Sequence, residues 1–258
     1  MRHQQPHPLL LSVIVFFICA SIAHAQMDAL KDLYQRAINA YGKQQYDQAI
    51  ALFGQIVKVA PTFAPAYNGM ALANQAASGD ENKTIEYLKT AISYDPKLVQ
   101  AYDNLGRIYY GRQDVDHAQE YFEKALKLDP NLASAQLSLA WINLLARSRP
   151  LTALKYFKEV AAVEHDPKIY FGMGSAYFAS NQRTQALEMI TKLHELQEED
   201  MASRLEDSMR QNAQVNTQTG ADANGNPATT PAGLGPLPAT EDKPTGIKVH
   251  LSGKLSDY

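Results

Sequence analysis

The chain has 258 residues, of which 45% are hydrophobic and 20% charged, and its formal net charge at pH 7 is −3. This composition is typical of a globular protein with one or two domains. The slight excess of acidic residues argues against a nucleic-acid partner, because no basic stripe is available to neutralise phosphates.

The first 25 residues have the features of a secretory signal peptide. Arg2, His3 and His7 precede an apolar run from Leu9 to Ile18, and Ala23-His24-Ala25 follows it. A basic start, a short apolar run and a small-residue end are the signature of such a segment. We therefore expect cleavage after Ala25 and an exported, periplasmic protein whose mature chain has no integral membrane span. The alternative, an uncleaved anchor, requires a longer apolar run than this one.

The only cysteine, Cys19, lies inside this segment. Ile18 precedes it, where a lipoprotein signal has a small residue, so no lipid anchor is expected. The mature chain then has no cysteine and forms no disulfide, so its fold depends on packing alone.

Residues 99–132 form the clearest structural pattern, which predicts two short helices that end at an Asp-Pro pair. Counted from Val99, the recurring residues are Tyr102 at place 4, Leu105 at 7, Gly106 at 8, Tyr109 at 11, Ala118 at 20, Phe122 at 24, Ala125 at 27 and Pro130 at 32. The small residues let two helices approach closely, and the large ones fill the space between them. The proline has no backbone N–H to donate and ends the second helix.

The same pattern recurs along the chain at a spacing of about 34 residues. We predict five helix pairs, in repeats 30–63, 64–98, 99–132, 133–166 and 167–200. The second repeat has one extra residue, which most simply lies in the turn Ser78-Gly79-Asp80. The fourth is degenerate, because Ala153 and Phe157 fit its second helix only with a shift of one place, and Pro150 is expected to begin that helix.

This pattern resembles the tetratricopeptide repeat (TPR), and the tandem copies make the resemblance specific for the fold. It implies an all-α protein of exported bacterial TPR type: a right-handed α-solenoid of about five helix pairs within residues 26–212. Residues 201–212, in which Met201, Leu205 and Met209 are four apart, are expected to form a capping helix that closes the end of the solenoid.

The C-terminal part of the chain changes in character. Residues 213–245 are rich in Asn, Thr, Gly, Ala and Pro, and they are expected to form a disordered linker. In residues 246–258, Ile247, Val249 and Leu251 alternate with polar neighbours, which is the period of a strand. Such a segment either pairs with a partner sheet or has no structure of its own.

No constellation of residues with catalytic or metal-binding spacing is found. The histidines of the mature chain, His117, His165, His194 and His250, lie far apart in repeat order and have no second ligand at helical spacing. Neither a Gly-rich phosphate loop nor a Gly-x-Ser-x-Gly elbow is present. We therefore expect no enzyme, no cofactor and no metal site.

The resemblance implies that the first helix of each pair lines a concave groove. The expected partner-binding residues are Tyr34, Ile38, Tyr41, Leu72, Arg107, Tyr110, Leu137, Trp141, Leu144, Phe171 and Phe178. Exposed aromatic side chains in a concavity are typical peptide anchors. The alternative is that some of them pack against neighbouring helices, because a superhelix partly buries these places.

One TPR subtype is excluded by its residues. The clamp that holds chaperone C-termini needs lysine, asparagine and arginine at fixed places of the first helices. Place 5 instead reads Tyr34, Asn68, Asp103, Leu137 and Phe171, so the clamp is absent.

These observations favour an exported scaffold that binds a protein or peptide partner through the groove, during assembly of an envelope or secretion complex. Two alternatives stay open. One is a factor that binds polysaccharide or envelope glycan through its groove aromatics, and the other is docking of a partner through the strand-like tail.

Overall fold

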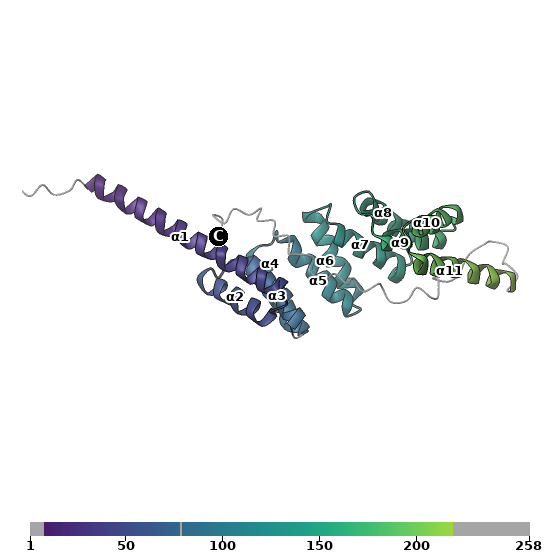
Figure 1. Cartoon of the computed structure of the whole chain (residues 1–258), viewed down its shortest axis with the longest axis horizontal. Helices are drawn as coiled ribbons and strands as arrows, with labels where there is room; N and C mark the ends of the chain where they lie inside the picture. The colour runs from purple at the N-terminus through teal and green to yellow at the C-terminus, as the bar shows by residue number, and fades with distance from the viewer. Residues whose placement is uncertain (1–7, 78, 219–258) are drawn as a thin grey trace, which may run out of the picture. The chain divides into compact units, whose positions relative to one another are not determined.

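The computed structural model describes residues 8–77 and 79–218 of the chain. Within these ranges the protein forms eleven α-helices and one π-helical turn, with no strand (Figure 1). The all-α prediction is therefore confirmed. Most of the predicted linker and the strand-like tail lie outside the described residues. No helix in the described ranges combines the length and the apolarity that crossing a membrane requires.

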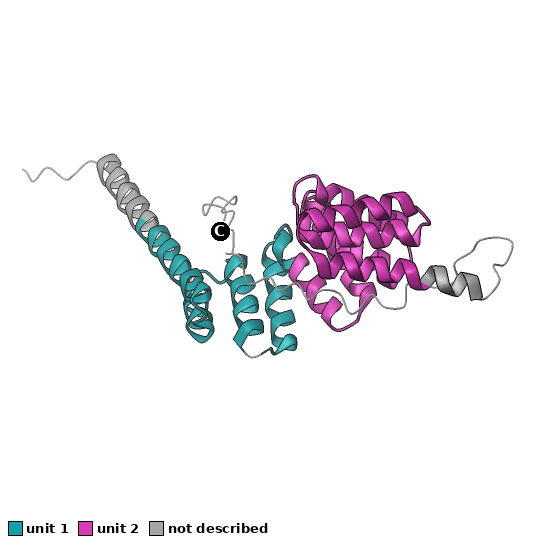
Figure 2. Cartoon of the chain, turned by 45° about the vertical axis from the view of Figure 1, so that its right-hand side comes forward, with its two compact units in different colours: residues 1–101, 243–258 teal, residues 102–242 magenta. Residues whose placement is uncertain are grey.

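The described helices belong to two compact units, whose boundary falls within helix α5 after Ala101 (Figure 2). In the first unit each helix packs on the next along the chain, and the first also contacts the third. These helices are α1 (Pro8–Gly42), α2 (Tyr46–Val59), α3 (Ala64–Ala77) and α4 (Glu81–Tyr94).

The second unit continues the same succession of helix pairs, and its last helix packs on the two before it. Its elements are α5 (Val99–Gly111), α6 (Val115–Leu128), α7 (Ala133–Trp141), the π-turn η1 (Ile142–Ala146), α8 (Pro150–Ala161), α9 (Pro167–Ala179), α10 (Arg183–Glu195) and α11 (Glu199–Gln218). The two helices of each predicted repeat are therefore present.

Contacts between phenylalanine rings and glycines determine how closely these helices approach one another. The Phe122 ring, at place 24 of the third repeat, lies against Gly106, the small residue at place 8. Phe53 lies in the same way against Gly69, which belongs to the following repeat. All three aromatic rings at place 24 or its shifted equivalent, those of Phe53, Phe122 and Phe157, are essentially inaccessible to solvent. Packing of a phenylalanine ring against a glycine therefore occurs both within a repeat and between neighbouring repeats.

The extra residue of the second repeat lengthens a helix instead of a turn. Helix α3 has 14 residues, whereas α5 and α9 have 13. Gly79, with φ of 66°, lies two residues before α4, and Gln113, with φ of 62°, lies two residues before α6. The prediction that the insertion lies in the turn was therefore wrong. The residue with positive φ keeps the same distance from the following helix in both repeats, and the extra residue lengthens the end of α3.

The π-turn η1 explains the shifted register of the fourth repeat. The backbone N–H of Arg147 donates to the carbonyl of Ile142, five residues earlier, so this turn contains one residue more than an α-helical turn. The buried Asn143 side chain donates to the Leu139 carbonyl at 2.8 Å. Downstream, Ala153 and Phe157 are one place late yet fully buried, and Pro150 begins α8 as predicted.

The helix expected after the fifth pair is α11. Its Ala202, Leu205 and Met209 are buried in the core shared with α9 and α10. The helix continues to Gln218, so residues 213–218, at the start of the predicted linker, are helical. Extending a docked helix adds one hydrogen bond for each residue fixed, which favours this continuation.

Candidate functional site

In the first unit, the candidate groove residues divide into buried and half-buried side chains. Tyr34 is 8% exposed, and its ring meets Phe53 and Phe63 edge-on, with centroids 5.7 and 5.4 Å away. Burial raises the pKa of its hydroxyl to about 12. Tyr41 is equally buried and contacts Tyr46. The remaining candidates of this unit, Ile38 and Leu72, are half-buried.

In the second unit, Trp141 begins a row of stacked side chains that crosses α7, α9 and α11. Its indole meets the Phe157 ring edge-on at 5.1 Å and lies 6.5 Å from Phe171 with the planes 34° apart. The guanidinium of Arg204 lies over the Phe171 ring, 5.3 Å from its centroid. Trp141 is only 6% exposed, so each helix in this row covers the aromatic ring of the one before it.

Five of the eleven candidates are therefore core residues in this structure, as the packing alternative predicted. They are Tyr34, Tyr41, Trp141, Leu144 and Phe171. The reason is that neighbouring helices of the stack cover these places. This packing could not be predicted from one repeat at a time, and a partner-binding role for these five stays a prediction.

The other candidates of the second unit are half-buried and lie on successive first helices. Arg107 and Tyr110 belong to α5, Leu137 to α7 and Phe178 to α9. Partial burial raises the pKa of the Tyr110 hydroxyl to about 12. These side chains combine a fixed position with an accessible apolar surface, and their role as partner contacts stays a prediction.

The sequence interpretation missed a second set of accessible apolar side chains, which occur where each second helix ends. They are Val59 and Tyr94 in the first unit, and Leu128, Val163 and Leu196 in the second. Their spacing follows the repeat, so the periodicity was a signal that could have found them. Leu151 and Leu187, 65% and 53% exposed, lie instead near the starts of α8 and α10.

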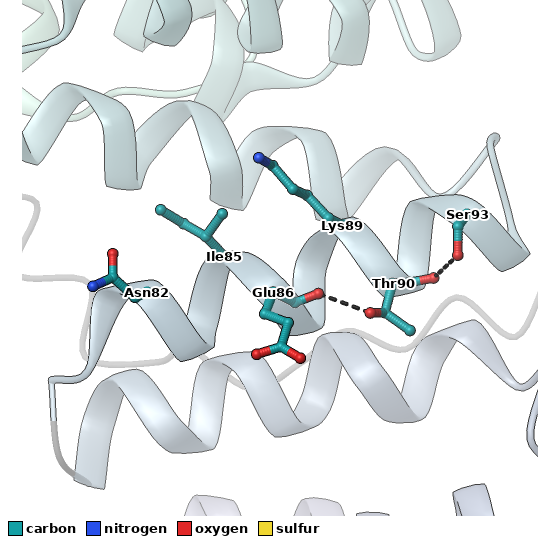
Figure 3. A pocket seen from close by; sticks show the side chains of 6 residues that line it. All are labelled: Asn82, Ile85, Glu86, Lys89, Thr90 and Ser93. Carbon is teal, nitrogen blue, oxygen red and sulfur yellow. Dashed lines mark hydrogen bonds between the residues drawn. The ribbon is translucent and has the colours of Figure 1, made fainter.

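A shallow depression on α4 offers little chemistry of its own. Figure 3 shows its lining residues, which all come from one face of this helix: Asn82, Ile85, Glu86, Lys89, Thr90 and Ser93. The Thr90 hydroxyl donates to the Glu86 carbonyl at 2.9 Å, and the Ser93 hydroxyl to the Thr90 carbonyl at 2.7 Å. Both hydroxyls are engaged with the backbone of their own helix, and no base is positioned to activate them.

Several titratable groups of the described residues form surface ion pairs. No cluster of three or more His, Cys, Asp or Glu side chains that suits a metal ion occurs among those residues. His194 Nδ1 lies 2.8 Å from Glu199 Oε2, and this carboxylate raises the pKa of the imidazole. The contact joins α10 to α11 and stabilises the fold at that point.

Comparison with family models identifies the type of repeat that these helix pairs form. Two models described as tetratricopeptide repeat match residues 99–132 and 33–62. The chain contains tetratricopeptide repeats (TPR) in these two segments. The first match coincides with the repeat from which the pattern was read, and the second lies within the first predicted repeat.

Curated relatives of this TPR protein include co-chaperones. The chain is 32% identical over 92 residues to the heat-shock protein cognate co-chaperone sgt12 of Aspergillus fumigatus, which covers 36% of this chain and 27% of that protein. It is 26% identical over 128 residues to heat shock protein STI1 of Saccharomyces cerevisiae, covering 48% and 21%. The similarity therefore spans only about a quarter of the length of these relatives.

Solved structures show the same fold at low sequence identity. A crystal structure of MamA is 19% identical with a TM-score of 0.55, covering 66% of this chain and 92% of that one. PilF of Pseudomonas aeruginosa is 16% identical with a TM-score of 0.57, covering 76% and 95%. These similarities concern the helix-pair architecture alone.

Proposed function

We propose that this TPR protein is an exported, non-enzymatic scaffold that binds a protein segment during assembly of an envelope or secretion complex. The observation that carries the proposal is a set of half-buried apolar side chains on successive first helices of the second unit. They are Tyr110 on α5, Leu137 on α7 and Phe178 on α9.

The chemistry of these residues suits a peptide ligand. An aromatic or aliphatic side chain that is partly buried loses little rotamer freedom on binding, and it presents apolar area for an anchor residue. The similarity to proteins named as co-chaperones supports a role in protein–protein interaction. Export is supported by the basic, apolar and small-residue pattern of residues 1–25.

The burial of Trp141 argues against the alternative in which the groove aromatics bind a glycan. Sugar rings stack on an exposed aromatic face, whereas this indole already contacts Phe157 and Phe171. Peptide binding requires only the accessible edges of the half-buried side chains, and it is therefore the interpretation that we retain.

The test compares a triple variant with a matched surface variant. Tyr110→Ala, Leu137→Ala and Phe178→Ala are combined in the full chain, and Leu187→Ala on α10 is the control, because this leucine is 53% exposed on a second helix. Affinity capture from the envelope fraction with quantitative mass spectrometry should show at least one protein that the control retains and the triple variant loses. Equal protein sets from two folded variants, as judged by circular dichroism, would contradict binding through the first helices.

Export is tested separately. Fractionation of the producing cells and mass spectrometry of the mature N-terminus should give a chain that begins at Gln26. A full-length chain in the cytoplasmic fraction would disprove the localisation and leave the binding proposal intact.

A further inference from the structure

An exposed leucine lies at a hollow where α8 and α10 begin, on the second helices of the fourth and fifth repeats, and exposed cations occur in the same stretches of sequence. The side chains of six residues line a hollow there: Arg149, Pro150, Leu151, Thr152, Ser180 and Gln182. Leu151 is 65% exposed and presents its apolar surface at this hollow. None of the half-buried candidate side chains of the first helices lines this hollow.

The sequence around this hollow is locally basic in an otherwise acidic chain. Residues 130–158 contain no aspartate or glutamate but include Arg147, Arg149, Lys155 and Lys158. Lys155 follows Leu151 by one helical turn and shares its face of α8. Arg183, the first residue of α10, directly follows Gln182 of the lining.

The cations at the hollow differ from their neighbours in how they are paired. Elsewhere in the same unit, Lys124 and Arg147 form ion pairs with Glu120 and Asp116. Among the described residues, no carboxylate lies within ion-pair distance of Arg149, Lys155 or Arg183. Their charges are therefore available to a carboxylate from outside the unit.

The positions of the two arginines are unfavourable for the helices that they begin. The N-terminus of a helix carries a partial positive charge, which an acidic side chain stabilises and a basic one destabilises. The first turns of α2, α4 and α6 follow this rule, with Asp47, Glu81 and Asp116. The first turns of α8 and α10 have no acidic residue and adjoin Arg149 and Arg183. Helix stability therefore does not explain why arginines occupy these two positions.

We propose that this hollow is a second docking surface, which binds a short acidic segment of a partner protein with an apolar side chain next to its carboxylates. The apolar side chain packs on Leu151, and the carboxylates pair with Arg149 and Arg183, with Lys155 at the flank. Charge complementarity identifies the occupant. Arg149 lines the hollow with the exposed Leu151, and Lys155 and Arg183 lie on the two helices that begin there. These cations match a segment that alternates acidic and apolar residues.

The probe for the test is a fluorescein-labelled peptide, Glu-Glu-Leu-Glu-Glu-Leu, titrated with the full chain and followed by fluorescence anisotropy. The structure predicts saturable binding that weakens when salt rises from about 50 to about 500 mM, because exposed charges are screened. Replacing the peptide glutamates by glutamine, or its leucines by serine, should each weaken binding severalfold. Equal affinity for the glutamine peptide would contradict the charge contacts.

The matched variants carry the same change in net charge. Arg149→Glu with Arg183→Glu should lower the affinity by about tenfold or more, because two attractive contacts become repulsive. Lys43→Glu with Lys89→Glu, both exposed cations of the first unit, should leave it within about twofold. The two arginine reversals place acids at helix N-termini, so loss of folding is not expected to confound the result.

The remaining outcomes also decide the proposal. An equal loss in both double variants would show a general charge effect, and absence of saturation by the wild-type chain would overturn the site. Binding to vesicles with about one-third phosphatidylglycerol, without binding to the peptide, would identify a membrane surface in place of a protein partner. The Tyr110, Leu137 and Phe178 triple variant should still bind the peptide, so failure here and failure of the proposed groove are distinguishable.

Discussion

The Phe157 ring occupies the space that a side chain at position 172 would need. A Cβ atom built on Gly172 would lie 2.3 Å from Phe157 Cζ, and Phe157 is fully buried. This contact joins α8 to α9, the second helix of one repeat to the first helix of the next. It shows that the interface between repeats depends on glycine for a steric reason.

Gly172→Ala should therefore destabilise the protein by about 1–3 kcal/mol, the usual cost of overpacking a core. Gly54→Ala is the matched control, because nothing lies within 4 Å of a Cβ at that helical position. The control should stabilise by about 0.5–1 kcal/mol, since alanine favours a helix over glycine. Urea denaturation followed by circular dichroism measures both, and a neutral Gly172→Ala would show that Phe157 can move aside.

Trp141→Ala should cost about 3–5 kcal/mol, because it removes a buried indole from contact with Phe157 and Phe171. Chemical denaturation of this variant measures the loss by circular dichroism. Since Trp141 is the single tryptophan of the chain, the wild-type emission should shift to longer wavelength on unfolding. Unchanged stability of Trp141→Ala would mean that the indole is exposed in solution, as the original groove interpretation required.

Gln113→Gly should stabilise the protein by up to about 1 kcal/mol, because Gln113 has φ of 62° and glycine adopts this conformation without strain. Gln44, at the equivalent turn with φ of 61°, should respond in the same direction. The reverse change, Gly79→Ala at φ of 66°, should destabilise by about 1 kcal/mol. Thermal unfolding midpoints of the three variants test the sign at each turn.

The docking of α11 should depend on pH through His194. Glu199 and, more weakly, Glu206 of α11 face this imidazole, at 2.8 and 3.5 Å, and raise its pKa above the usual value of 6.5. A raised pKa in the folded state means that the protonated form stabilises the fold. The contribution is fully present below about pH 6.5 and is lost as the pH rises through the folded-state value.

Hydrogen exchange of α11 at pH 5.5 and pH 8.5, corrected for the intrinsic pH dependence, measures this contribution. The wild-type chain should show a larger loss of protection at the higher pH than His194→Gln, which has no titrating imidazole. An identical pH dependence in both proteins would assign it to another group.

Local sequence rules predicted those features that depend on contacts within one repeat. Close helix approach at the small residue Gly106, Pro150 at the start of α8 and the alternation of helices were all predicted from spacing, because each follows from the size or the backbone of a residue at a fixed place. The shift at Ala153 and Phe157 was also visible in the sequence. Its cause, the π-turn after Trp141, was not, because an inserted residue can be accommodated in a helix or in a turn.

Burial of the candidate site was decided by tertiary structure. Leu137 and Phe171 occupy the same place in their repeats, yet Leu137 is half-buried and Phe171 is covered by Arg204 of α11. Which neighbour covers a side chain depends on the next helix pair, and that information is absent from the repeat itself. The same holds for the hollow at Leu151, where the start of α8 meets the turn before α10.

The amino-acid sequence by itself determined that this chain is a series of helix pairs in five repeats, because residue size and backbone preference act locally and recur with the repeat. Only the tertiary structure decided which side chains of those helices remain accessible. Accessibility depends on packing between repeats, and there Trp141 joined the core while Leu151, which lines the hollow with Arg149, stayed at the surface.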